Sequence, residues 1–305
     1  MIHPDIVGCD VSKHFLDLFE AGRNERLDNT PAVCAALAAR LGGRFVVFEA
    51  TGAYDKRLRD ALAGAGVAFA RVNPGRARDF ARAAGFLAKT DKIDARMLAA
   101  MGRALAPPAE TAPDRDRERL GELVKRRDQL VKMRAQESVR AAECIDRDVR
   151  IDIDSHLAWL DRRIERLELA IKTLTKTNAA IAREIARLKS APGVGPVTAT
   201  VLVALMPELG ARSPKTIAAL AGLAPLNADS GQKRGQRRIR GGRRRVREAL
   251  YMAAISAIRS KTRLGAFYRR LRQAGKTAKQ AIIAVARKLL VTLNAMVRDN
   301  AAFAS

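Results

Sequence analysis

The sequence predicts an α/β domain followed by an all-α region that ends in a strongly basic domain. Strand-like and helix-like segments alternate in residues 5–74, an apolar heptad pattern occupies residues 157–188, and basic helical segments follow residue 190. A chain of 305 residues is long enough for two or more packed domains. We divide it into residues 1–108, 109–189 and 190–305.

The α/β domain is predicted from short apolar runs that alternate with helix-like segments. Residues 5–10 and 44–49 are apolar runs that each end in an acid, and residues 14–20 alternate like a half-buried strand. A further strand is expected at 67–72, and helices at 31–41, about 54–64 and from about 74. The Pro107-Pro108 pair is expected to begin a linker that ends this domain.

The middle segment combines a charged helical stretch, residues 114–149, with a heptad seam. Apolar residues recur in the seam at alternating spacings of three and four, with Asn178 the polar exception. Its positions are Leu157, Leu160, Ile164, Leu167, Ile171, Leu174, Asn178, Ile181, Ile185 and Leu188. Ile and Leu at these positions favour a two-stranded coiled coil, and a buried Asn can fix its register. We favour pairing with a second chain over an intrachain hairpin with residues 114–149, whose apolar pattern is poorer.

The net charge of +25 is concentrated at the end of the chain. Residues 1–110 have a net charge of +3, residues 111–190 of +4 and residues 191–305 of +18. So basic a domain needs a polyanion, and nucleic acid is the usual one. An anionic membrane is disfavoured, because no apolar run of membrane-spanning length and no signal peptide is apparent. The three cysteines have neither disulfide nor metal spacing, so we expect a reducing, cytoplasmic setting.

Four acids are candidate metal ligands. Asp10 and Glu49 each end an apolar strand-like run, and Asp91 and Asp94 are three residues apart, so that on a helix they share one face. Magnesium prefers oxygen ligands, and two ions about 3.5–4 Å apart can stabilise a phosphoryl transfer. Strand-terminal acids are common, however, and Asp91 and Asp94 also suit the first turn of a helix.

The basic domain contains two candidate nucleic-acid-binding features. The PGVG turn with Gly193 and Gly195 resembles the hairpin of a helix-hairpin-helix, in which backbone N–H groups face a phosphate, although an ordinary turn between helices is the alternative. Residues 232–247 contain nine cations and no acid, which favours phosphate contacts over a merely solvated face. The candidate contacts in this run are Lys233, Arg234, Arg237, Arg238, Arg240, Arg243, Arg244 and Arg245.

Several motifs resemble one known family. The strings GCDVSK, FEATGAY and KTDKIDARM, in this order, are similar to those of the Piv-type transposases and invertases of the insertion sequence 110 family. AGLAPLNADSG, followed by IRGG and VREALYMAA, resembles the C-terminal transposase domain of the same family. The resemblance extends from about residue 5 to residue 290.

The resemblance implies a RuvC-like, RNase H-like first domain with a DEDD magnesium site of two ions, formed by Asp10, Glu49, Asp91 and Asp94. It also implies that Ser230, in the SG pair beside the basic run, is the nucleophile that attacks DNA. A lone serine next to glycine is common in loops, so this role depends on the family motif. The resemblance further implies a structured bridge RNA that pairs with target and donor DNA.

These observations predict a transposase or recombinase that cuts and rejoins DNA. The expected partners are DNA, a bridge RNA and a second copy of the chain, with assembly to a tetramer on DNA as an option. Two alternatives remain: a metal-dependent junction-resolving nuclease in which Ser230 is structural, and a nucleic-acid-binding protein without enzymatic activity. The first predicts cleavage that survives loss of the serine hydroxyl, and the second predicts no cleavage at all.

Overall fold

The computed structural model describes residues 5–86, 91–110, 112–226 and 238–303. For Asp91, Lys92, Leu226 and Arg238 it describes the backbone only. The chain divides into two compact units, Met1–Pro113 and Asp114–Ser305, each with its own buried cores. The division of the second unit into a helical segment and a basic domain remains a prediction.

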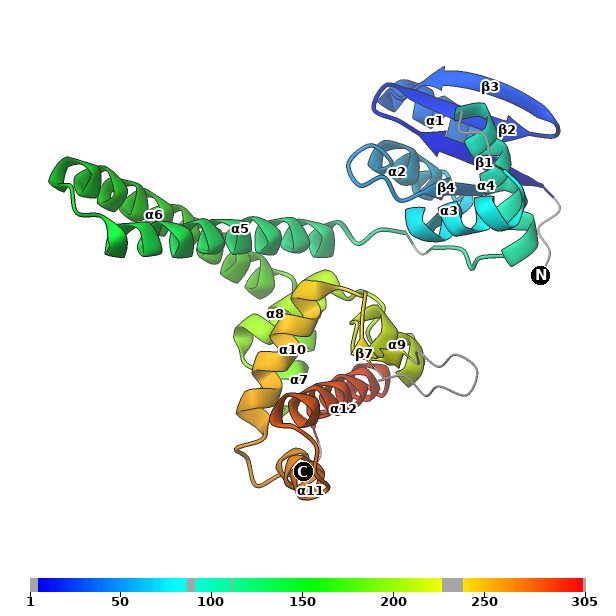
Figure 1. The fold of residues 1–305 in the computed structure, drawn as a ribbon. Helices are drawn as coiled ribbons and strands as arrows, with labels where there is room; N and C mark the ends of the chain where they lie inside the picture. The colour runs from blue at the N-terminus through cyan, green and yellow to red at the C-terminus, as the bar shows by residue number, and fades with distance from the viewer. Residues whose placement is uncertain (1–4, 87–90, 111, 227–237, 304–305) are drawn as a thin grey trace. The chain divides into compact units, whose positions relative to one another are not determined.

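The first unit is built on a five-stranded mixed sheet with the strand order β3-β2-β1-β4-β5 (Figure 1). Strands β1, β2 and β3 pair antiparallel, and β1, β4 and β5 pair parallel. The strands are β1 Ile6–Val11, β2 Phe15–Glu20, β3 Arg23–Asp28, β4 Phe45–Glu49 and β5 Ala68–Val72. The predicted α/β class is confirmed, and the mixed sheet is consistent with a RuvC-like domain.

Helices cover both faces of this sheet. On one face, apolar residues of β1, β2 and β4 pack with Cys34, Leu37, Leu58 and Leu62 of helices α1 and α2. On the other face, Ile6, Phe45 and Val47 pack with α3 and α4. The helices are α1 Pro31–Arg40, α2 Lys56–Gly64, α3 Pro74–Ala83 and α4 Asp91–Leu105. The result is a three-layered α/β/α unit with one core on each side of the sheet.

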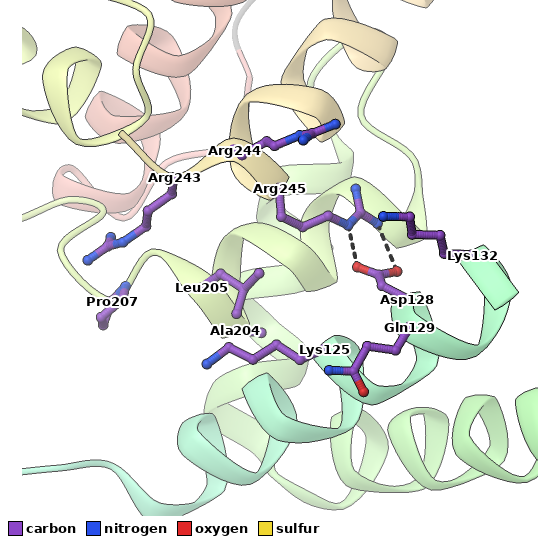
Figure 2. A pocket seen from close by; sticks show the side chains of 10 residues that line it. All are labelled: Lys125, Asp128, Gln129, Lys132, Ala204, Leu205, Pro207, Arg243, Arg244 and Arg245. Carbon is purple, nitrogen blue, oxygen red and sulfur yellow. Dashed lines mark hydrogen bonds and ion pairs between the residues drawn. The ribbon is translucent and has the colours of Figure 1, made fainter. Parts of the chain in front are cut away.

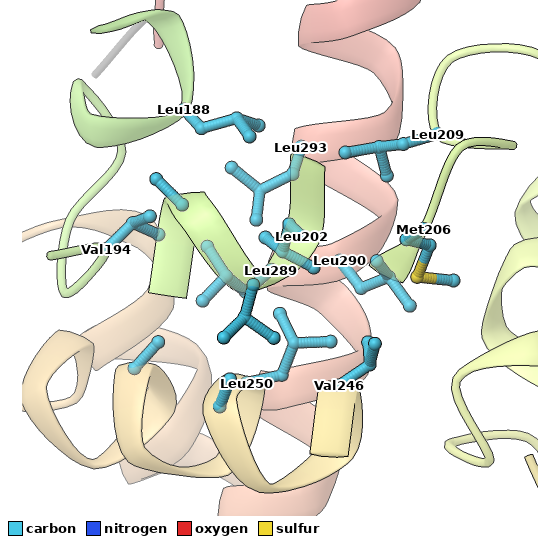
Figure 3. Packing of buried hydrophobic residues seen from close by; sticks show 14 of the residues in the cluster. Leu188, Val194, Leu202, Met206, Leu209, Val246, Leu250, Leu289, Leu290 and Leu293 are labelled. Atoms are coloured by element: carbon cyan, nitrogen blue, oxygen red, sulfur yellow. The ribbon is translucent and has the colours of Figure 1, made fainter. Parts of the chain in front are cut away.

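The second unit is helical and is built around α8, α10 and α12. Figure 3 shows Leu202 of α8, Val246 and Leu250 of α10, and Leu289 and Leu290 of α12 meeting in its core. A two-stranded sheet, β6 Pro225–Leu226 with β7 Arg238–Ile239, lies between α9 and α10 in the sequence. The helices are α5 Arg115–Glu143, α6 Arg147–Thr177, α7 Ala179–Lys189, α8 Pro196–Leu205, α9 Pro214–Leu220, α10 Arg244–Ala257, α11 Arg263–Gln273 and α12 Ala278–Arg298.

Helices α5 and α6 lie side by side as an intrachain hairpin (Figure 1). Leu160 and Ile164 of the seam pack against Leu130 of α5. Farther along, Leu174, Ile181 and Leu188 join the core of the second unit together with Leu120 and Val124 of α5. These five seam residues are therefore buried by the intrachain arrangement that we disfavoured, and they need no second chain to cover them.

The heptad pattern predicted that Asn178 lies inside a continuous coiled coil, and this prediction was wrong. The extended backbone of Asn178, with φ −88° and ψ 104°, ends α6 and begins α7. Its side-chain oxygen accepts hydrogen bonds from the N–H groups of Ala180 and Ile181, and its amide donates to Asp116 at 2.8 Å. Asn is a favoured helix-capping residue, and here capping replaces the expected register-fixing role.

Helix α12 has the length and composition of a membrane-spanning segment, with a mean hydropathy of 1.4. Half of that apolar window is buried within the protein. Leu289, Leu290 and Leu293 are fully buried in the core of the second unit. The apolar character of α12 is therefore explained by its position at the centre of a helical core.

Candidate active site and nucleic-acid interface

Asp10 and Glu49 occupy adjacent positions on neighbouring parallel strands. The register pairs Gly8 with Val47 and Cys9 with Phe48, so the next positions along β1 and β4 are Asp10 and Glu49. Parallel strands are about 4.8 Å apart, which brings the two backbones close together. Asp10 is half-buried near the carboxyl end of β1, and Glu49 is half-buried at the carboxyl end of β4. The sheet therefore brings together two acids that are 39 positions apart in the sequence.

Both acids lie on the face of the sheet that α4 covers. Cys9 and Phe48 belong to the core beneath α1 and α2, whereas Ile6 and Val47 belong to the core beneath α4. Side chains alternate between the two faces of a strand, so Asp10 and Glu49 share the face of Ile6 and Val47.

The direction of α4 brings its first turn to the same edge. A methyl group added to Gly8 would lie 2.0 Å from the carbonyl oxygen of Ala95, and one added to Gly102 would lie 2.9 Å from Cγ2 of Ile6. Residue numbers thus rise along α4 as they fall along β1. The helix begins at Asp91, before Ala95, and its N-terminal turn therefore lies toward the end of β1 that holds Asp10. Asp94 directly precedes Ala95 in this turn.

The packing thus brings Asp10, Glu49 and the turn of α4 that contains Asp94 to one end of the sheet, where the parallel strands β1 and β4 end; we call this end the acidic edge. The backbone of Asp91 begins the adjoining helix. Within the described part of the chain, no group of three or more His, Cys, Asp or Glu side chains is arranged to hold a metal ion. The donor chemistry fits magnesium, because every candidate ligand is a carboxylate. Cys9 is no competitor: burial, followed by the charge of Asp10, raises the pKa of its thiol well above its ordinary value. The four-acid metal site remains a prediction.

Sequence reasoning missed a fifth acid on this face, Asp17. It lies opposite Asp10 in the pairing of β1 with β2, and it is only 4 % exposed. Arg26 on β3 binds both of its carboxylate oxygens at 2.9 Å. This bidentate pair compensates the charge of Asp17, so Asp17 repels the neighbouring carboxylates less than an unpaired acid would. The sequence signal that could have identified Asp17 was its position within the alternating, strand-like run of residues 14–20.

The loop after Glu49 contains a second overlooked acid, Asp55. Its side chain is 1 % exposed, and neither carboxylate oxygen has a hydrogen-bond partner among the described residues. The hydroxyl of Thr51, in the same loop, is also buried without a hydrogen-bond partner among the described residues. Burial raises the pKa of Asp55 and outweighs the opposing charges of Arg71 and Arg59. Arg71 forms an ion pair with Asp55 at 3.6 Å.

The predicted nucleophile lies outside the described residues. Ser230, Lys233, Arg234 and Arg237 belong to residues 227–237, and only the backbone of Arg238 is described. The flanking residues are informative: Pro225 pairs with Ile239 and Leu226 with Arg238 in an antiparallel ladder. The two ends of the segment that contains Ser230 are therefore held together.

Three arginines of the basic run have carboxylate partners that the sequence pattern did not reveal. Arg243 binds Glu208 through two hydrogen bonds of 2.6 Å, and Arg244 binds Glu248 at 2.7 Å. Arg245 forms a two-bond pair with Asp128 of α5. These carboxylates supply part of the counter-charge of the run, and its contact with phosphate remains a prediction. Arg240 is exposed and forms no ion pair within the described ranges.

Replacing Glu208 by Gln is expected to lower the free energy of unfolding of the second unit by about 1 kcal/mol at pH 7. Burial raises the pKa of Glu208, but the hydrogen bonds and charge of Arg243 outweigh burial and hold that pKa below its ordinary value. Stability from a depressed pKa is present above the unfolded-state pKa and is lost as the pH falls through the folded-state pKa.

The difference in free energy of unfolding between the unmodified protein and the Glu208→Gln variant, measured by urea unfolding, should therefore shrink as the pH falls below 4.5, the ordinary pKa of a Glu side chain. Glu165→Gln is the matched control, because Glu165 is exposed and has no ion pair in the described structure. A Glu208→Gln protein as stable as the control at pH 7 would contradict the stabilising role of this pair.

The two glycines of the PGVG turn differ in their surroundings. Gly193 has a φ of +79°, and a methyl group there would lie 2.2 Å from the carbonyl oxygen of Ala253 on α10. Close packing against α10 therefore requires this glycine. Gly195 begins α8 with open space around its Cα, and the neighbouring Val197 is half exposed. The N-terminus of α8 remains accessible, and its contact with phosphate remains a prediction.

Acids gathered at the edge of a mixed sheet, in one chain with a cationic helical unit, are features of an enzyme that acts on nucleic acid. Comparison with known proteins narrows this class. A family model for DEDD proteins of the IS110 type, described as Transposase, matches residues 7–147. A second, described as Transposase IS116/IS110/IS902 family, matches residues 185–269.

Two similar relatives are the pilin gene-inverting proteins of Moraxella bovis and Moraxella lacunata. They are 32% and 31% identical to this chain over 268 residues, which cover 85% of this chain and 81% of each relative. A 43.6 kDa protein of the insertion element IS110 from Streptomyces coelicolor is 36% identical over 121 residues, 39% of this chain and 30% of that protein. The chain belongs to the IS116/IS110/IS902 family of transposases and is a DNA transposase or recombinase.

Proposed function

We propose that this enzyme cuts and rejoins DNA through a phosphoserine intermediate, with a DEDD magnesium site in the first unit and Ser230 as the nucleophile. The observation that supports the metal site best is the antiparallel packing of α4 on β1, which brings the first turn of α4 to the edge holding Asp10 and Glu49. Carboxylates on three elements can together bind two magnesium ions. Bound magnesium would withdraw negative charge from the scissile phosphate.

The proposed reaction has two balanced steps. The Oγ of Ser230 attacks the phosphorus, the bond from phosphorus to one deoxyribose oxygen breaks, and that oxygen leaves as a hydroxyl. The serine loses its proton to water, and the leaving oxygen gains one from water. In the second step a hydroxyl of another DNA end attacks the phosphoserine, which restores the serine and forms a new phosphodiester. A covalent intermediate conserves the energy of the broken bond.

We further propose that a structured RNA guides this reaction and that the active assembly contains at least two chains. The net charge of +18 over residues 191–305 and the low aromatic content of 4% suit a partner bound through phosphates rather than through stacked bases. The relatives from Moraxella are described as gene-inverting proteins, and we propose that this chain likewise rearranges DNA.

A covalent protein–DNA adduct at Ser230 is the expected result that tests this function. The probe is an end-labelled linear DNA fragment containing the gene with its native flanking DNA, incubated with the full-length protein, magnesium and RNA transcribed from the flanks. After denaturation and proteolysis, mass spectrometry should find the adduct on the peptide containing Ser230. It should disappear in Ser230→Ala and persist in Ser155→Ala, which removes an exposed serine of α6. Recombination by Ser230→Ala protein would instead support a plain metal nuclease.

A further inference from the structure

A pocket of about 690 Å³ lies in the second unit between helices that are distant in the sequence (Figure 2). Helix α5 forms one wall with Lys125, Asp128, Gln129 and Lys132. The end of α8 and the turn after it contribute Ala204, Leu205 and Pro207, and the start of α10 contributes the arginines. The pocket is thus lined both by the α5–α6 hairpin, through α5, and by the basic run, through Arg243, Arg244 and Arg245.

The pocket is rich in positive charge. Five of its ten lining residues are cations, and Asp128 is the sole acid among those ten. The cations are Lys125, Lys132, Arg243, Arg244 and Arg245. Both lysines are exposed, and neither ammonium forms an ion pair within the described parts of the chain. An anion is therefore the complementary occupant.

Two of the arginines are held in place before any ligand binds. Asp128 accepts two hydrogen bonds from Arg245, and Glu208 accepts two from Arg243. A guanidinium has five N–H donors, so each pair leaves three donors for a ligand. Fixing a long side chain in advance reduces the entropy that binding would otherwise lose. These ion pairs therefore position the guanidinium groups and do not occupy all their donors.

The position of α10 adds to the electrostatic attraction. Arg243 is its N-cap residue and makes no side-chain capping bond, and no acid lies in the first turn. The first N–H groups of a helix lack intrahelical partners and face outward with a partial positive charge. The floor formed by Ala204, Leu205 and Pro207 is apolar and suits contact with a sugar. Cationic walls over an apolar floor match the alternation of phosphate and sugar in a nucleic-acid backbone.

We propose that this pocket binds backbone phosphate of the nucleic acid, and that α5 is consequently part of the nucleic-acid interface. The proposal rests on the proposed function in one respect, namely that the enzyme binds nucleic acid. It adds Lys125, Gln129 and Lys132 to the interface, none of which belongs to the basic run. It also assigns Asp128 a restraining role, because its carboxylate repels a phosphate while it binds the guanidinium groups of Arg245 and Arg127.

Replacing Lys125 and Lys132 together by Gln should weaken binding about tenfold at moderate salt. The slope of log K against log salt should become less negative by roughly 0.9 for each phosphate that the protein no longer neutralises. The measurement is fluorescence anisotropy of the full-length protein with a labelled 30-base-pair DNA duplex and, separately, a labelled RNA hairpin. Weaker binding of either probe supports the proposal and identifies the nucleic acid that occupies the pocket.

The matched control replaces Lys172 and Lys176 by Gln, since both are exposed lysines of the neighbouring helix α6 outside the pocket. Equally weakened binding in the two double variants, or unchanged binding in Lys125→Gln/Lys132→Gln, would overturn the pocket assignment. Absence of binding by the unmodified protein would contradict the proposed function itself, so the two failures are distinguishable.

Asp128→Asn provides a second test with the opposite sign. Removing the only acid of the lining should tighten binding about threefold or more and make the salt slope steeper. If Asp128 served only to tie α5 to α10, the variant would bind more weakly, and that result would overturn the restraining role. Thermal unfolding in the binding buffer verifies that the variant is folded at the assay temperature.

Discussion

Replacing Asp10 by Asn is expected to lower the rate of strand cleavage about a thousandfold or more while nucleic-acid binding stays within about twofold. The amide keeps the shape of the side chain but removes the charge that would bind magnesium, and the loss of metal-assisted phosphoryl transfer accounts for the size of the effect. Binding should persist because residues 191–305, with their net charge of +18, supply most of the phosphate contacts.

The measurement is a time course of cleavage of the native flanking DNA, with anisotropy as the binding assay. Asp28→Asn is the matched control: Asp28 is an exposed acid of the same unit, at the end of the edge strand β3. Full cleavage by Asp10→Asn protein would remove the metal site from the proposed mechanism. A parallel loss of binding would indicate misfolding, which circular dichroism would detect.

Replacing Gly8 by Ala is expected to destabilise the first unit by about 3 kcal/mol and to reduce cleavage strongly. The added methyl group would lie 2.0 Å from the carbonyl oxygen of Ala95 and 2.6 Å from the amide nitrogen of Ala99. Both atoms belong to the backbone of α4, so no side-chain rotation can relieve the overlap. The helix must move away from β1, and the turn that contains Asp94 must move with it.

Gly64→Ala is the control, because Gly64 lies in α2 and a methyl group there meets no atom within 4 Å. Alanine is favoured over glycine in helices, so that variant should be as stable as the unmodified protein or more stable. Urea unfolding and the cleavage assay measure both effects. If Gly8→Ala protein matched Gly64→Ala protein in stability and activity, α4 could not be as closely packed on β1 as described.

The apolar strands and the helices of the first unit could be predicted because their hydrophobic patterns are strong. The run 44–49 became β4 at Phe45–Glu49, and the helix expected at 31–41 became α1 at Pro31–Arg40. Strand β3 was missed. Its sequence RNERLD lies at the edge of the sheet with most side chains exposed, so no alternation of apolar and polar residues identifies it.

The partners of charged and apolar groups were harder to predict because they are distant in the sequence. Arg245 and Asp128 are separated by 117 residues, so nothing in the sequence indicates that they form an ion pair. The seam was recognised from its period, but its partner was not, because α5 presents only scattered apolar residues such as Leu120, Val124 and Leu130. A period identifies a buried face without identifying what buries it.

The central position of α12 has a consequence for synthesis of the chain. The first unit is made of contiguous residues, so it can fold while the ribosome is still translating the rest. The second unit cannot complete its core until α12 has been made, because Leu289, Leu290 and Leu293 are buried in that core together with residues of α8 and α10. The acidic edge therefore forms on the nascent chain before the cationic unit is assembled. A message truncated before α12 would yield a folded first unit attached to helices without a core.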